Sequence, residues 1–122
     1  MKFDELIAGP QMIGLIWLIV GWVMIKYPSK DINNGYGYRT NASMKNQQTW
    51  DEANRFSARL MVKHGAVLVL TGLVVGIAYQ NSIIPKSIEN GLRPLLMIGP
   101  IILSAILLIV TTEKHLKRTF SQ

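Results

Sequence analysis

Three long apolar runs constrain this chain more than any other feature of its sequence. Phe3–Tyr27 carries charge only at its ends, and neither Gly65–Tyr79 nor Pro94–Thr112 carries any. A helix needs roughly 20 apolar residues to cross a bilayer core about 30 Å thick. The first and third runs meet this length. The second meets it when it is extended back to Leu60, because the long side chains of Arg59–His64 can reach the headgroups.

These runs predict an all-α membrane protein that forms a single domain over residues 1–122. The three transmembrane helices are expected at about residues 5–27, 60–79 and 93–112. The polar segment 28–59 separates the first two spans and becomes a long loop.

The first run is predicted to stay in the protein rather than to be cleaved as a signal peptide. Asp4 and Glu5 stand where a signal peptide has a basic leader. The run is followed by Lys26, Tyr27 and Pro28, without the small residues of a cleavage site.

The net charge of +6 is distributed as in a membrane protein rather than a nucleic-acid-binding protein. Lys2, Lys86 and Arg93 lie at one predicted membrane face, whereas the other ten cations lie in and beside segment 28–59 and in the C-terminal tail. An excess of Lys and Arg marks the cytoplasmic side. We therefore expect the N-terminus outside and the loop and tail in the cytoplasm. The expected partners of these cations are anionic lipid headgroups, and no nucleic acid.

The start of the second helix is predicted at the surface of the membrane. Thr49 and Glu52 fit a capping box, in which a Thr hydroxyl and a Glu carboxylate satisfy the first free amides of a helix. From Trp50 no proline or glycine interrupts the sequence until Gly65, and the pattern continues to Tyr79. The first three turns of this helix should project from the membrane at its interface with the cytoplasm.

Glycines mark helix-packing faces in two of the predicted spans. Gly72 and Gly76 form a GxxxG pattern, which Gly65 extends on the small-residue face. We expect these three to pack against another helix, and a homo-oligomer is a further hypothesis. Gly14 and Gly21 lie seven residues apart, which is consistent either with close helix packing or with glycines facing lipid.

Segment 37–57 carries a long polar motif between the first two spans. It consists of Gly37-Tyr38-Arg39-Thr40, Ser43-Met44-Lys45-Asn46, Thr49-Trp50 and Ala53-Asn54. This motif resembles the signature of the SdpI/YfhL family, small bacterial membrane proteins related to the immunity protein against the sporulation-delaying-protein toxin. The family arrangement also resembles this chain, with one span before the motif and two after it. Larger family members carry additional spans before this unit.

The resemblance implies a multi-pass protein of the bacterial cytoplasmic (inner) membrane. It further implies resistance to a membrane-active peptide toxin, coupled in some members to relief of transcriptional repression. The leading hypothesis is an immunity factor that binds the toxin, or a lipid the toxin exploits, through the cytoplasmic loop. An alternative is a signalling or scaffold protein that docks a cytoplasmic regulator such as a repressor. A weaker alternative is a small transporter or lipid-handling protein.

The positions that match the motif most distinctively form the candidate ligand- or partner-binding site. They are Arg39, Ser43, Asn46, Trp50 and Asn54. Trp50 and Asn54 are one helical turn apart, and the planar fork of Arg39 suits a phosphate. These side chains are equally suited to hold the loop against the helix by hydrogen bonds, and both interpretations stay open.

No catalytic, metal or cofactor site is expected. His64 and His115 lack the spacing of metal ligands, and adjacent Asp51 and Glu52 point to different helix faces. The chain has no cysteine, which excludes disulfides and thiol catalysis. His64 lies where the second span enters the membrane, where it either reaches the headgroups or serves proton movement. The sequence therefore favours a binding protein over an enzyme.

Overall fold

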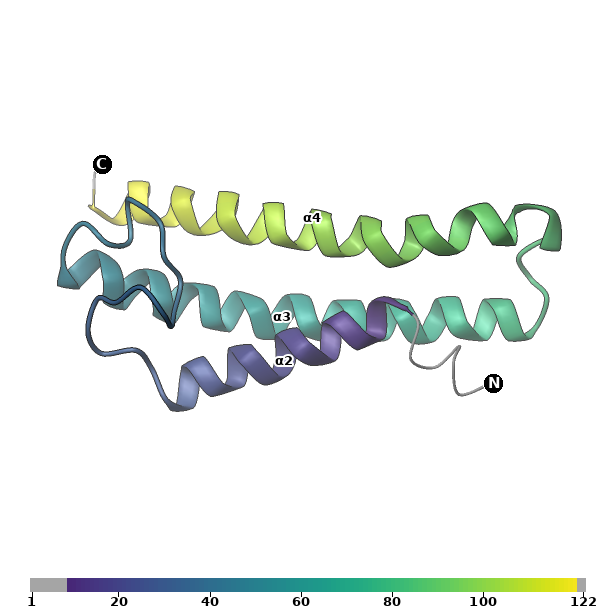
Figure 1. Cartoon of the computed structure of the whole chain (residues 1–122), viewed down its shortest axis with the longest axis horizontal. Coiled ribbons are helices and arrows are strands. Elements are labelled where there is room, and N and C mark those ends of the chain that lie inside the picture. Colours follow the sequence, from purple (N-terminus) through teal and green to yellow (C-terminus); the bar gives the residue numbers. More distant parts are fainter. Residues whose placement is uncertain (1–8, 121–122) are drawn as a thin grey trace.

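The computed structural model describes residues 9–120, and this part of the chain folds into three helices. They are α2 (Pro10–Lys26), α3 (Gln47–Gln80) and α4 (Lys86–Phe120). Successive helices run in opposite directions, so the loop 27–46 and the end of α4 meet at one end of the molecule (Figure 1). The prediction of an all-helical chain is confirmed for the described residues.

Two of the helices, α3 and α4, are long and apolar enough to cross a membrane. With 34 and 35 residues, each is about 50 Å long at 1.5 Å per residue, well above the thickness of a bilayer core. Both are therefore longer than a single span requires. α2 is apolar but shorter, with 17 residues. Residues 5–8 of the predicted first span lie outside the described residues.

α3 and α4 both extend beyond the predicted spans 60–79 and 93–112. α4 begins at Lys86, and Pro94 lies inside the helix. Its end also continues through the basic tail to Phe120. Hydropathy locates the part of a helix that suits lipid, whereas the helical hydrogen bonds continue through polar residues on either side.

α2 and α3 pack so closely that their backbones touch. A Cβ atom on Gly14 would lie 2.7 Å from the carbonyl oxygen of Gly65, and a Cβ on Gly65 would lie 2.7 Å from that of Gly14. Further along α2, a Cβ on Gly21 would come within 2.9 Å of the Ala58 carbonyl oxygen. Of the two alternatives for Gly14 and Gly21, the structure shows helix packing.

The other two glycines of the predicted packing face lie toward the far end of α3. A Cβ on Gly72 would meet the backbone nitrogen of Gln11 at 2.5 Å, so this glycine also lies against α2. Gly76 lines a small cavity nearby. Because Gly65 and Gly72 are covered within the chain, they leave no surface for a second copy, and a homo-oligomer stays a prediction.

α4 is attached to the other helices along a narrow stripe. Its buried side chains occur every four residues: Ser104, Leu108, Thr112 and Leu116. The Ser104 hydroxyl lies 3.1 Å from Nδ1 of His64 on α3. The rest of its middle section exposes large apolar side chains, among them Ile98, Ile102 and Ile106. This surface suits lipid contact.

Candidate functional site

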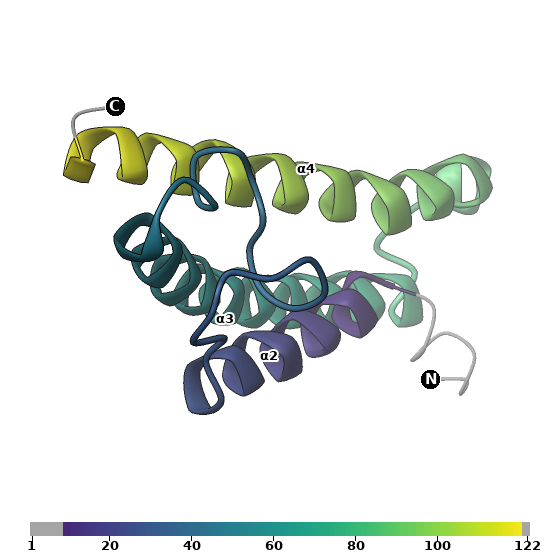
Figure 2. The ribbon, with the colours of Figure 1, turned by 60° about the vertical axis from the view of Figure 1, so that its left-hand side comes forward.

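The loop 27–46 folds onto the start of α3 and reaches the end of α4 (Figure 2). Trp50, in the first turn of α3, is fully buried, and its Nε1–H donates to the Ser29 carbonyl oxygen at 2.9 Å. One turn later, Asn54 accepts a hydrogen bond from the Tyr38 N–H at 2.7 Å and donates to the Trp50 carbonyl oxygen at 2.9 Å. These two side chains hold the loop on α3 at both its beginning and its middle.

Gly37 allows the loop to approach Asn54 this closely. Its φ of +115° lies in the region that side chains with a Cβ rarely adopt. A Cβ there would also lie 2.5 Å from Asn54 Oδ1 and 3.2 Å from Trp50 Cζ2. The position therefore requires glycine on two independent grounds.

The last part of the loop caps α3. Asn46 is the N-cap: its Oδ1 accepts from the Thr49 N–H at 2.9 Å, while Thr49 Oγ1 accepts from the Asn46 N–H at 3.2 Å. The prediction that Thr49 caps the helix with Glu52 was wrong, because Asn46 provides the same hydrogen bonds three residues earlier. Ser43 is fully buried just before this cap, and its hydroxyl accepts from the Thr40 N–H at 2.8 Å.

Two loop hydroxyls connect the motif to α4. Tyr38 and Thr40 both donate to Oε1 of Glu113, at 2.7 and 2.6 Å. Burial, together with the adjacent Glu113 carboxylate, raises the pKa of the Tyr38 hydroxyl, which therefore remains a hydrogen-bond donor at neutral pH. The carboxylate joins segments more than seventy residues apart in the sequence.

A second connection joins the start of α3 directly to the end of α4. Nε2 of His115 lies 2.7 Å from Oε1 of Glu52, and the His115 ring stacks on Phe56 with 4.0 Å between centroids. Arg55 also pairs with Glu52, and its hydrogen bond is the main reason that the pKa of the Glu52 carboxyl is lowered. We call the loop and these two connections, made by Glu113 and His115, the clasp.

The structure places four of the five predicted site residues inside the clasp or at its cap. Ser43, Trp50 and Asn54 are buried, and Asn46 caps α3. Arg39 is exposed and lies outside the buried part of the clasp, where one of its nitrogens donates to the Asn34 carbonyl oxygen. This geometry favours holding the loop over direct ligand contact for the four, and ligand binding by these residues stays a prediction.

Sequence reasoning missed the partners in α4. Glu113 and His115 follow the third apolar run and resemble ordinary tail residues, so no local pattern singles them out. Gly37 and Thr40 did belong to the quoted motif, but only the folded loop shows what each contacts.

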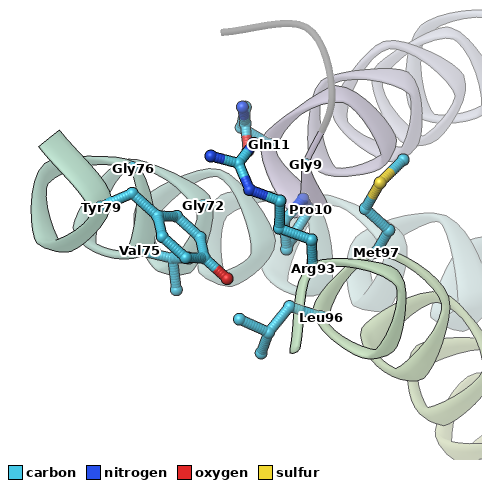
Figure 3. A pocket seen from close by; sticks show the side chains of 10 residues that line it. All are labelled: Gly9, Pro10, Gln11, Gly72, Val75, Gly76, Tyr79, Arg93, Leu96 and Met97. Atoms are coloured by element: carbon cyan, nitrogen blue, oxygen red, sulfur yellow. The ribbon is translucent and has the colours of Figure 1, made fainter. Parts of the chain in front are cut away.

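A cavity of about 340 Å³ lies beside the clasp, between the end of α2 and the first turns of α3. Its walls combine apolar and charged side chains: Met24, Ile25, Pro28, Ser29, Lys30, Asp51, Asn54, Arg55 and Arg59. A smaller cavity of about 180 Å³ lies at the other end of the molecule, and Arg93 and Tyr79 are among the residues that line it (Figure 3). The Arg93 guanidinium lies over the Tyr79 ring and pairs with Glu89. Within residues 9–120, no three His, Asp or Glu side chains gather in a metal-holding cluster.

Comparison with known proteins identifies relatives of this chain. The family described as the SdpI/YfhL protein family matches residues 30–112, which include the motif, α3 and most of α4. The uncharacterized protein YfhL of Bacillus subtilis (strain 168) is 46% identical over 69 residues, which make up 53% of this chain. The match spans 63% of the length of YfhL. No solved structure matches the chain.

Proposed function

Because the chain belongs to the SdpI/YfhL family, as its motif indicated, we propose that it is an immunity-type membrane protein. In this proposal it crosses the bacterial inner membrane three times, with its N-terminus outside, and confers resistance to a membrane-active peptide. The observation that carries the proposal is the clasp, in which the family motif joins the loop, α3 and α4 into one polar platform. The proposal includes no catalytic step.

The outer rim of the clasp is the contact surface in this proposal. Most motif side chains make their hydrogen bonds to other groups of the clasp, so their role in this proposal is to hold the platform in one conformation. Arg39 is exposed, and its guanidinium is oriented by a hydrogen bond to the Asn34 carbonyl oxygen. A guanidinium offers five donors in a plane, and the remaining ones suit a carboxylate, a phosphate or the backbone carbonyls of a peptide.

Bacterial growth in the presence of a panel of membrane-active peptides tests this function. Cells that express the wild-type protein should survive at least one peptide, and cells with Arg39→Ala should lose that protection at equal protein abundance in the membrane. Lys117→Ala is the matched control, because it removes one exposed cation at the same end of the molecule but outside the loop. A wild type that protects against no peptide on the panel, or equal loss in both variants, contradicts the proposal.

A second candidate is a platform that docks a soluble regulator. The observations that favour it are the length of α3 and α4, which exceeds the thickness of a bilayer core, and the charged residues that both helices carry at the clasp end. A pull-down with the same variants distinguishes the two functions. Loss of resistance by Arg39→Ala with partner binding intact favours direct peptide recognition, whereas loss of both favours docking.

A further inference from the structure

The cavity beside the clasp exists because α2 and α3 diverge toward the end of α2. Their backbones touch where Gly21 meets Ala58, and α2 then slants away from α3 (Figures 1 and 2). The space that opens has a volume of about 340 Å³. This is within the usual range for small-ligand sites in proteins.

Positive charge dominates the lining of this cavity. Asp51, Arg55 and Arg59 follow each other at four-residue spacing along α3, and Lys30 faces them from the loop. Asp51 accepts from Gln47, and Arg55 is held by Glu52. In contrast, neither the Arg59 guanidinium nor the Lys30 ammonium makes an ion pair or hydrogen bond with any residue from 9 to 120. Together with Arg55 these two cations outnumber Asp51, the one acidic side chain among the residues that line the cavity.

In the membrane placement proposed above, on which this inference rests, the cavity lies at the depth of lipid headgroups. Arg59 precedes the first residue of the charge-free stretch, Gly65, by six positions, or about 9 Å along the helix at 1.5 Å per residue. On the α2 side, Lys26 lies over the exposed Trp22 ring at 5.0 Å, an arrangement typical of the membrane interface. The cavity thus opens where phosphate groups are most concentrated.

The apolar wall of the cavity continues into a surface suited to acyl chains. Met24, Ile25 and Pro28 form this wall. Ile25 is 49% exposed, and the neighbouring side chains along the outer face of α2, Trp22 and Ile19, are exposed as well. A ligand that follows the wall outward has a charged end at Arg59 and an apolar end against α2.

We propose that this cavity binds the headgroup of one anionic phospholipid from the leaflet on the side of the clasp. Arg59 is the main contact of the phosphate, with Lys30 and Arg55 at the rim, and the acyl chains lie along α2. The planar donors of arginine match phosphate oxygens in pairs, and the net positive lining disfavours a lipid without net negative charge. The inference is independent of the resistance function.

Native mass spectrometry of the purified full-length protein tests this site. The protein is freed of lipid in a non-ionic detergent and mixed with phosphatidylglycerol or phosphatidylcholine at equal concentrations. One phosphatidylglycerol should bind more tightly than phosphatidylcholine. Arg59→Gln should weaken it about fivefold, as expected for one cation at a lipid surface, and Lys30→Gln should weaken it less.

Lys63→Gln is the matched control, because Lys63 is an exposed cation one turn beyond Arg59 that does not line the cavity. It should leave binding near the wild-type value. Equal binding of the two lipids, or equal losses in Arg59→Gln and Lys63→Gln, would overturn the proposal in favour of general surface charge. Displacement of the lipid by millimolar inorganic phosphate would overturn it in favour of a soluble anion. Circular dichroism of each variant verifies that the helices are intact.

Discussion

α2 and α4 are attached to the same central helix in opposite ways. α2 lies against α3 through glycines, with no side chains between the backbones at Gly14 and Gly65. α4 touches α3 along a narrow stripe and is fastened at one end by the polar side chains of the clasp. The first contact depends on the absence of a side chain, and the second depends on hydrogen bonds between polar side chains.

This difference separates the roles of the two contacts. Close packing of small residues holds helices together inside lipid. There the hydrophobic effect does not drive association, because lipid tails are as apolar as the side chains themselves. The exposed apolar surface of α4 therefore does not fix its position. The clasp adds polar contacts at one end of α4, and changes to the clasp should move that end of α4 without displacing α2.

The largest effect is expected from filling the contact between α2 and α3. Gly65→Leu places a side chain where the Gly14 carbonyl oxygen and the Leu18 backbone nitrogen lie within 2.8 Å of the new Cβ. The helices must separate, so we expect a loss of about 3 kcal/mol in the free energy of unfolding. Unfolding in mixed micelles measures it. Gly99→Ala in α4 is the control, because nothing lies within 4 Å of its Cβ, and a similar loss there would contradict the explanation.

A smaller effect is expected from opening the clasp at α3. Asn54→Ala removes the acceptor of the Tyr38 N–H and the side-chain donor to the Trp50 carbonyl. Leaving these partly buried groups unpaired should cost about 2 kcal/mol. Limited proteolysis should then cleave the loop 27–46 faster than in the wild type, while cysteine crosslinks between α2 and α3 form as before. Unchanged cleavage would show that Asn54 does not hold the loop.

A still smaller effect is expected where the clasp meets α4. Glu113→Gln keeps an oxygen for Tyr38 and Thr40 but removes its charge, which weakens both hydrogen bonds. We expect a loss of about 1 kcal/mol. The spectroscopic pKa of Tyr38 should also fall, because part of its elevation comes from the Glu113 carboxylate. An unchanged Tyr38 pKa in Glu113→Gln would contradict the contribution of the Glu113 charge.

The smallest effect on the free energy of unfolding is expected from the ionisation of Tyr38, and it should be visible only at alkaline pH. The pKa of Tyr38 is raised in the folded protein, whereas that of an unfolded tyrosine is about 10. Above that pH the unfolded chain loses this proton first, so the free energy of unfolding falls as the pH rises. The decline should be steeper in the wild type than in Tyr38→Phe. If the free energy of unfolding declined equally with pH in the two proteins, the ionisation of Tyr38 would not contribute to the decline.

The sequence by itself determined the helical class, the presence of helices apolar enough to cross a membrane, and the family. Each depends on local information: the length of the apolar runs and the motif residues between Gly37 and Asn54. The capping residue of α3 was misplaced by three positions, because Asn46 and Thr49 both have a side chain suited to that role.

Only the tertiary structure decided which groups the motif side chains contact and where the larger cavity lies. Whether Trp50 and Asn54 face outward or inward depends on the path of the loop, which Gly37 permits and Glu113 completes from the far end of the chain. The cavity at Arg59 likewise results from the angle at which α2 leaves α3. Contacts between distant segments depend on side-chain packing in three dimensions, and no local pattern in a single sequence records them.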